Sequence, residues 1–228
     1  MISPNLNKSP DAARSYAPTL AASLLVGAMA LLVFYGITLG FRALTFEHTL
    51  RISLAEQPRH LPDIPITDVS ATGASPKRTL VETIRADGRV TLLAFFYTRC
   101  TTLCSALGSE FQQLQDQLEP ADLGRRVRLL SVTFDPHFDT TERLQRYGEW
   151  QHARPGLWMF ARPEDSADLR SLLRTCGVLL MPDGAGGYRH TANIYLVGSN
   201  GDLLGVYGLG EGRRALDAAI AESRKVLR

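Results

Sequence analysis

The chain has 228 residues, with 25 Lys and Arg against 23 Asp and Glu, so its net charge at pH 7 is only +2. Proteins that bind nucleic acids usually concentrate positive charge, and this small net charge argues against such a partner. Hydrophobic residues make up 45% of the chain, which is ordinary for a globular protein and excludes disordered and fibrous classes. The charges are unevenly distributed, because no Lys, Arg, Asp or Glu occurs between Ser15 and Phe41.

The uncharged segment predicts a membrane-spanning helix over residues 17–41. A helix needs about 20 apolar residues to cross a bilayer core of about 30 Å, and Arg14 and Arg42 stand at the two ends of this run. A cleavable signal peptide has a shorter apolar core and a small-residue cleavage site, and no A-x-A pattern follows here. A buried core helix would carry a polar face. We therefore expect an uncleaved single-span anchor.

The tail before the helix sets the expected orientation. Basic residues stand on both sides of the helix, so their count does not decide it. A short tail such as residues 1–16 commonly stays in the cytoplasm, and we expect the rest of the chain on the outer side of a bacterial-type inner membrane, in the periplasm. Residues 42–59 are expected to form a short stalk. Residues 60–228 are long enough for one domain with a substantial core.

The remainder of the chain alternates between strand and helix patterns. Val90–Tyr97 and Val127–Phe134 are continuous apolar runs, typical of strands buried on both faces. The order of strands and helices along the chain predicts an α/β, thioredoxin-like fold, in which helices flank a central mixed sheet. The other expected elements are helices over Ser105–Leu118, Asp139–Trp150, Ser166–Thr175 and Arg213–Leu227, a strand over Leu157–Phe160, and a hairpin of Ala192–Val197 with Leu203–Tyr207.

Two of the three cysteines, Cys100 and Cys104, lie between the first of these strands and the helix after it. The start of a helix favours a thiolate over a thiol, and residues four apart share one helix face. Both sulfurs can therefore point at one object, either a metal ion or each other in a disulfide. Two thiolates suit Cu(I), or Zn(II), but they need a third ligand to complete a site.

His190 is the candidate for the third ligand. It comes directly before the strand expected over Ala192–Val197, and in a thioredoxin-like fold the loop entering that strand faces the cysteine turn. Thioredoxins place a cis-proline there, whereas no proline follows Pro182 in this chain. An imidazole at this place binds metals. The other histidines stand in the expected stalk or at polar positions, namely His48, His60, His137 and His152.

Three stretches of the chain are similar to one known family. They are Phe95–Cys104 with its C-x-x-x-C spacing, Ser131–Pro136 with the Asp-Thr pair that follows it, and His190–Gly201. In these stretches the chain resembles the Sco/SenC family of membrane-anchored, thioredoxin-fold copper proteins that help to assemble the copper centre of cytochrome c oxidase. The similarity covers most of residues 60–228.

The resemblance implies a metallochaperone rather than an enzyme. The resemblance implies that Cys100, Cys104 and His190 bind copper, as Cu(I) or Cu(II). Asp135 is expected near the site, where its carboxylate orients His190 or binds water. The implied partners are the copper-binding subunit of cytochrome oxidase and a thioredoxin-like reductant of the two cysteines.

The chain departs from the family pattern at three positions. Thr101 and Ser105 stand where the family commonly has proline, and Arg189 stands where an aspartate often precedes the histidine. The missing proline leaves an additional N–H at the start of the helix, and an arginine disfavours further positive charge beside it. We expect these changes to affect copper affinity and partner choice more than the fold.

Other functions remain open at this stage. The first is a periplasmic thiol–disulfide oxidoreductase, against which the long cysteine spacing and the missing cis-proline count. The second is a redox or copper sensor. A purely structural disulfide between Cys100 and Cys104 is a further reading of the pair. Cys176 is expected to be a buried core residue that takes no part in the site.

Overall fold

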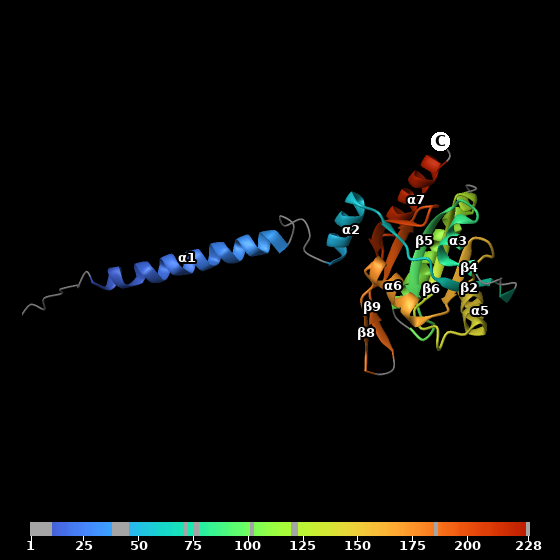
Figure 1. Cartoon of the computed structure of the whole chain (residues 1–228), viewed down its shortest axis with the longest axis horizontal. Coiled ribbons are helices and arrows are strands. Elements are labelled where there is room, and N and C mark those ends of the chain that lie inside the picture. Colours follow the sequence, from blue (N-terminus) through green and yellow to red (C-terminus); the bar gives the residue numbers. More distant parts are fainter. Residues whose placement is uncertain are drawn as a thin grey trace, which may run out of the picture. The chain divides into compact units, whose positions relative to one another are not determined.

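A computed structural model describes residues 11–37, 46–70, 73–74, 78–100, 103–119, 123–184 and 187–226 (Figure 1). The chain divides into two compact units, 1–49 and 50–228, each of which is described by itself.

The first unit is dominated by one long helix. Helix α1 covers Asp11–Ile37. Its segment Pro18–Ile37 is long and apolar enough to cross a membrane, and none of it is buried inside the protein. Residues 38–41, the end of the predicted span, lie outside the described residues. Helix α2, Phe46–Glu56, begins in this unit and continues into the second.

The second unit is an α/β domain. Its helices after α2 are α3 (Leu80–Arg85), α4 (Leu103–Leu118), the 3₁₀ turn η1 (Leu123–Arg125), α5 (Thr141–Trp150), α6 (Ser166–Cys176) and α7 (Gly212–Val226). Its strands are β1 (Arg59–His60), β2 (Pro65–Ser70), β3 (Gly73–Ala74), β4 (Arg78–Thr79), β5 (Val90–Phe96), β6 (Val127–Thr133), β7 (Trp158–Pro163), β8 (Leu180–Pro182), β9 (Tyr188–His190), β10 (Asn193–Val197) and β11 (Asp202–Gly208).

The main sheet is mixed and runs in the order β1-β11-β10-β5-β6-β7-β2-β3, with β4 paired to β2. Strands β5, β6 and β7 are parallel, and the antiparallel strand β10 pairs with β5 through Ile194 opposite Ala94. The start of β10 therefore lies at the carboxyl ends of β5 and β6, where chains of this class bind ligands. This confirms the thioredoxin-like fold predicted from the sequence.

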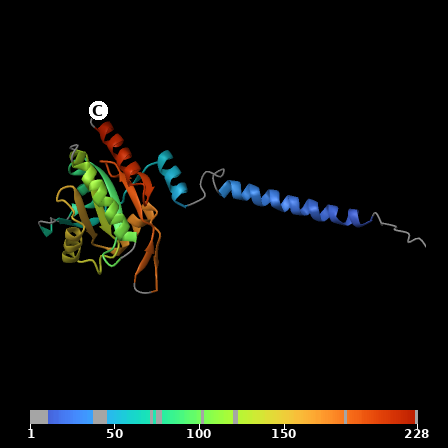
Figure 2. The same cartoon turned by 180° about the vertical axis from the view of Figure 1, so that it is seen from behind.

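The core fills the space between the sheet and its helices. Every residue of β5, β6 and β10 is buried, as the continuous apolar runs predict. Helices α4 and α7 contact each other on one face of the sheet (Figure 2), and the other face, which carries α6, is turned toward the viewer in Figure 1. Gly201, at φ +88°, forms the predicted turn between β10 and β11.

Several elements were not expected from the sequence. Helix α2 lies in the segment predicted as a stalk, and its Leu50 and Leu54 are buried. Strand β2 adds an edge to the sheet by pairing antiparallel with β7. The hairpin β8–β9 forms a separate two-stranded sheet, and it is this hairpin, rather than a loop, that contains His190.

Candidate copper site

The cysteine loop leaves the carboxyl end of β5. The N–H of Cys100 donates to the carbonyl of Tyr97 at 3.2 Å, which turns the chain sharply before α4 begins at Leu103. Cys100 is partly buried against the core. Cys104 occupies the first turn of α4 in the backbone, and its side chain lies outside the described residues.

A buried carboxylate anchors this loop. Asp139, just before α5, is fully buried, and one of its oxygens accepts from the Thr98 hydroxyl at 2.5 Å. The Thr98 N–H donates to the other oxygen at 3.2 Å, and that oxygen also accepts from the Thr133 hydroxyl at the end of β6. Burial raises the pKa of Asp139, although the hydrogen bonds from Thr133 and Thr98 oppose this. The cysteine loop is thereby fixed to both parallel strands.

Asp135, the residue expected near the copper site, lies at the end of β6. Its Oδ2 accepts from the Arg99 guanidinium at 2.5 Å, so the carboxylate is paired with the residue directly before Cys100. The carboxylate is buried while the arginine is partly exposed. The structure thus places Asp135 beside the cysteine loop, where it positions Arg99.

His190 is the last residue of β9, the second strand of the hairpin. It is buried, with 8% of its surface exposed, whereas its neighbour Arg189 is exposed. Successive residues of a strand point to opposite faces, so the side chains of Arg189 and His190 lie on opposite faces of β9. The Nδ1 atom of His190 lies 3.0 Å from the carbonyl of Thr191. Burial lowers the pKa of His190, which favours the neutral imidazole that can bind a metal.

Aromatic side chains hold the hairpin against the cysteine loop. The Tyr97 hydroxyl accepts from the N–H of Tyr188 at 3.1 Å. The ring of His190 packs edge-on to Phe134, with 4.9 Å between centroids, and to Tyr97, at 6.1 Å. Tyr97 therefore contacts both predicted ligand segments, because its carbonyl also accepts from Cys100. The sequence motif included Tyr97 and Phe134 but gave no sign of this role.

The donor set of two thiols and one imidazole suits a soft monovalent copper ion. Among the side chains that the structure describes, no three of His, Cys, Asp and Glu are grouped closely enough to hold a metal. The predicted ligand set is not among these side chains, because the Cys104 side chain lies outside the described residues. Cys176 is fully buried at the end of α6, and burial raises its thiol pKa, as expected of an inert core residue.

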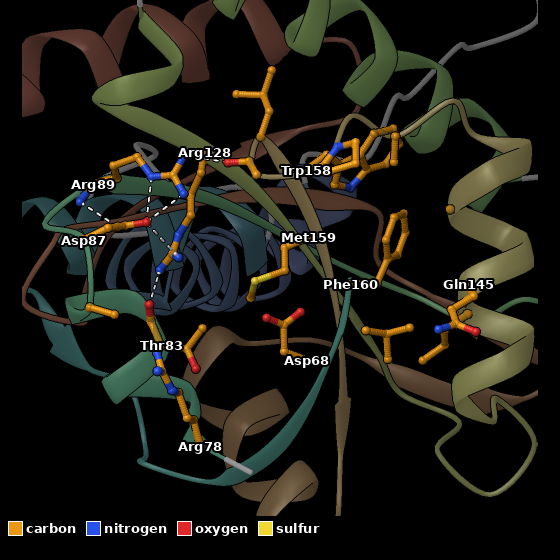
Figure 3. A pocket seen from close by; sticks show the side chains of 18 of the residues that line it. Asp68, Arg78, Thr83, Asp87, Arg89, Arg128, Gln145, Trp158, Met159 and Phe160 are labelled. Atoms are coloured by element: carbon orange, nitrogen blue, oxygen red, sulfur yellow. Dashed lines mark hydrogen bonds and ion pairs between the residues drawn. The ribbon is translucent and has the colours of Figure 1, made fainter. Parts of the chain in front are cut away.

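A second cavity, of about 300 Å³, lies at the amino-terminal ends of β6 and β7, opposite the cysteine loop (Figure 3). Arg128 is almost completely buried there and donates to the Thr83 carbonyl at 2.7 Å and the Thr91 hydroxyl at 3.0 Å. Asp87 lies between Arg128 and Arg89 (Figure 3). None of the described residues that line this cavity is a cysteine or a histidine, and they do not include Cys100 or His190.

The mixed sheet, the flanking helices and the cysteine loop at the end of β5 define a thioredoxin-like protein. The SCO1/SenC family model matches residues 75–225, and the chain belongs to that family.

Individual relatives agree with this assignment. A SCO1 protein homolog of Bacillus subtilis is 25% identical over 122 residues, which span 53% of this chain and 62% of that protein. BsSco, described as a Sco-family cytochrome c oxidase assembly protein with a disulfide switch, superposes with a TM-score of 0.60 at 22% identity, covering 74% of this chain and 96% of that structure. ScoI of Arabidopsis thaliana, solved with copper bound, gives a TM-score of 0.57 at 18% identity, covering 72% and 99%.

Proposed function

We propose that this chain is a membrane-anchored copper-binding protein that delivers copper during assembly of cytochrome c oxidase. Cys100 and Cys104 supply two thiolates, and His190 completes a Cys₂His site for Cu(I). The main support is the position of His190, which the hairpin β8–β9 holds buried against Tyr97 beside the cysteine loop. Family membership and the copper-bound state of the Arabidopsis relative support the choice of metal.

The thiol redox state gates copper binding in this proposal. A thiolate binds the metal, whereas a sulfur in a disulfide between Cys100 and Cys104 does not. A thioredoxin-like reductant is therefore needed before loading. The recipient is the copper-binding subunit of the oxidase. Asp135 forms an ion pair with Arg99, the residue directly before Cys100.

The apolar helix supports the proposed location at the membrane. Segment Pro18–Ile37 of α1 is the membrane anchor, with the tail in the cytoplasm and residues 60–228 in the periplasm. The anchor holds the copper site at the membrane in which the oxidase is assembled.

Titration with Cu(I) tests the proposal. The full chain in mild detergent is reduced or oxidised and titrated in competition with a chromophoric Cu(I) chelator. We expect one equivalent to bind to the reduced chain only. His190→Ala should weaken binding at least about tenfold, while His137→Ala, a matched change of an exposed histidine, should leave it unchanged. Equal binding before and after reduction would contradict the proposal.

The same variant separates the rival function. If His190→Ala retains copper binding but loses the ability to reduce a model disulfide, the cysteines serve thiol–disulfide exchange instead. The reactive cysteines would then still be Cys100 and Cys104, with His190 tuning a thiolate. Copper binding without transfer to the oxidase subunit would point to a sensor.

A further inference from the structure

A hollow of about 570 Å³ opens beside Cys100, between the cysteine loop and α5. We call it the Cys100 groove. It is lined by three arginines, Arg99, Arg143 and Arg146, and by the aromatic side chains of Phe138 and Trp150 as well as by Cys100 itself. None of the described residues that line it is acidic. A positively charged wall therefore borders one of the two predicted copper-binding thiols.

The register of α5 turns its basic residues toward the groove. Arg143, Arg146 and Trp150 are spaced three and four residues apart, so they share one helix face. Glu142 and Glu149 lie on the adjoining side of the helix, four residues before and three residues after Arg146. Neither glutamate lines the groove, and the described α5 side chains that do line it are basic or aromatic.

Two of the arginines are held in place before any partner arrives. The guanidinium groups of Arg99 and Arg143 stack on the ring of Phe138, at 4.2 and 3.8 Å from its centroid. Arg99 also donates to Asp135, and Arg143 to the carbonyl of Phe138, both at 2.5 Å. A guanidinium has five N–H donors, so each keeps donors for a further acceptor.

The side chains of Arg146 and Trp150 are exposed to solvent. Arg146 is exposed, and its charge interacts with that of Glu142, four residues earlier on α5. Trp150 is 62% exposed, although an indole is the kind of side chain that most often dominates a binding interface. An exposed cation and an exposed large aromatic side chain thus line the groove.

We propose that the Cys100 groove docks an acidic segment of the protein that exchanges copper or thiol electrons with Cys100. Carboxylates of that segment pair with Arg146 and with the remaining donors of Arg99 and Arg143, and an apolar side chain packs on Trp150. The inference rests on the proposed function, since it states that the protein that exchanges copper or electrons with Cys100 carries negative charge where it docks. It explains how a nearly neutral chain can select a partner near one cysteine.

Thiol–disulfide exchange with charged peptides tests the docking directly. The full chain in mild detergent carries Cys104→Ser, so that Cys100 reacts without being resolved. The probes are short peptides with one cysteine flanked by glutamates or by lysines, each in a disulfide with thionitrobenzoate. The Cys100 thiolate attacks the peptide sulfur, a new S–S bond forms, the old one breaks, and coloured thionitrobenzoate leaves with the electron pair.

We expect the glutamate peptide to react about tenfold faster than the lysine peptide at low salt, and the ratio to approach one at high salt. Arg146→Glu should reverse the preference, and Trp150→Ala should slow both peptides. Arg170→Glu, a matched change of an exposed arginine on α6, should have no effect. With uncharged dithiodipyridine, all variants should react like the parent, which separates docking from a change in the reactivity of the thiol.

Equal rates for the two peptides, or equal effects of Arg146→Glu and Arg170→Glu, would overturn the docking proposal. The Cu(I) titration distinguishes this failure from failure of the proposed function. If the peptides show no charge preference but reduction still governs Cu(I) binding, only the docking surface is wrong. If the preference holds and Cu(I) does not bind, the groove serves a thiol oxidoreductase.

Discussion

The buried carboxylate of Asp139 accepts hydrogen bonds from both the N–H and the hydroxyl of Thr98, two residues before Cys100. The same carboxylate accepts from Thr133, at the end of the adjacent strand β6. Because the Asp139 N–H in turn donates to the carbonyl of Asp135, one aspartate joins the loop after β5 to the loop after β6. The position of Cys100 relative to the sheet therefore depends on a residue that binds no metal.

Replacing Asp139 should loosen the cysteine loop and weaken copper binding. Asp139→Ala leaves a buried N–H and two hydroxyls without their acceptor, and each such loss costs about 1–3 kcal/mol. We expect the free energy of unfolding to fall by about 3 kcal/mol and Cu(I) affinity to fall about tenfold. Urea unfolding of the full chain in detergent and the chelator competition measure the two effects.

The control for this prediction removes the hydroxyl of Thr133 but keeps the shape of the side chain. Thr133→Val deletes the hydroxyl that donates to Asp139 and accepts from the N–H of Asp135. It should cost less than Asp139→Ala, about 2 kcal/mol, with little effect on copper. Thr98→Ala combined with Asp139→Ala should show strong coupling, because the two residues share a hydrogen bond. Additive effects of those two changes would contradict the anchoring role.

Arg128 should be required for stability and not replaceable by lysine. Its buried guanidinium bonds the Thr83 carbonyl, the Thr91 hydroxyl and Asp87 at once, a fork that a lysine ammonium does not reproduce. We expect Arg128→Lys to lower the free energy of unfolding by about 2 kcal/mol. Copper affinity should not change, because the cavity lies at the opposite ends of the strands from the cysteine loop. A parallel loss of copper affinity would show that the two ends are coupled.

The sequence predicts the central strands well because continuous apolar runs indicate strands that are buried on both faces. Val90–Phe96 and Val127–Thr133 have every residue buried, so few other structures would hide their side chains. Strand β2 was missed because it begins with proline and contains Thr67 and Asp68, and it becomes a strand only by pairing with β7. Leu50 and Leu54, four residues apart, were a signal for helix α2 that the stalk interpretation did not use.

The sequence predicted which residues form the candidate site, but not the hairpin and the hydrogen bonds that hold those residues in place. Spacing and position before β10 singled out Cys100 and His190. That His190 lies in a strand follows from the pairing of β8 with β9. Each of these strands has only three residues, too few to show a pattern of its own. Asp139 was expected inside a helix. Its place before the first helical residue, with Thr140 as the cap, is what frees its carboxylate to reach Thr98.

Asp68, in the second cavity, should make stability depend on pH. Burial raises its pKa above the ordinary value of 3.8, outweighing the opposing charges of Arg128 and Arg78. The folded state then binds a proton more tightly than the unfolded state, so stability falls as pH rises from 3.8 through the higher folded pKa. Asp68→Asn should therefore be more stable than the parent at pH 7, and the difference should shrink below pH 4. The exposed Asp217→Asn is the control and should show no such trend.

Glu211, directly before α7, should make the opposite contribution. The hydrogen bond from Arg51, at 2.5 Å, lowers the pKa of Glu211 from 4.5 to about 2. Its stabilising effect is therefore fully present above pH 4.5 and is lost as pH falls toward 2. A quarter of each side chain is exposed, so solvent screening limits the effect to about 1 kcal/mol. Glu211→Gln should lower the free energy of unfolding by that amount at pH 7 and by almost nothing near pH 2, and a difference that persists at pH 2 would assign the effect to packing of α2 rather than to charge.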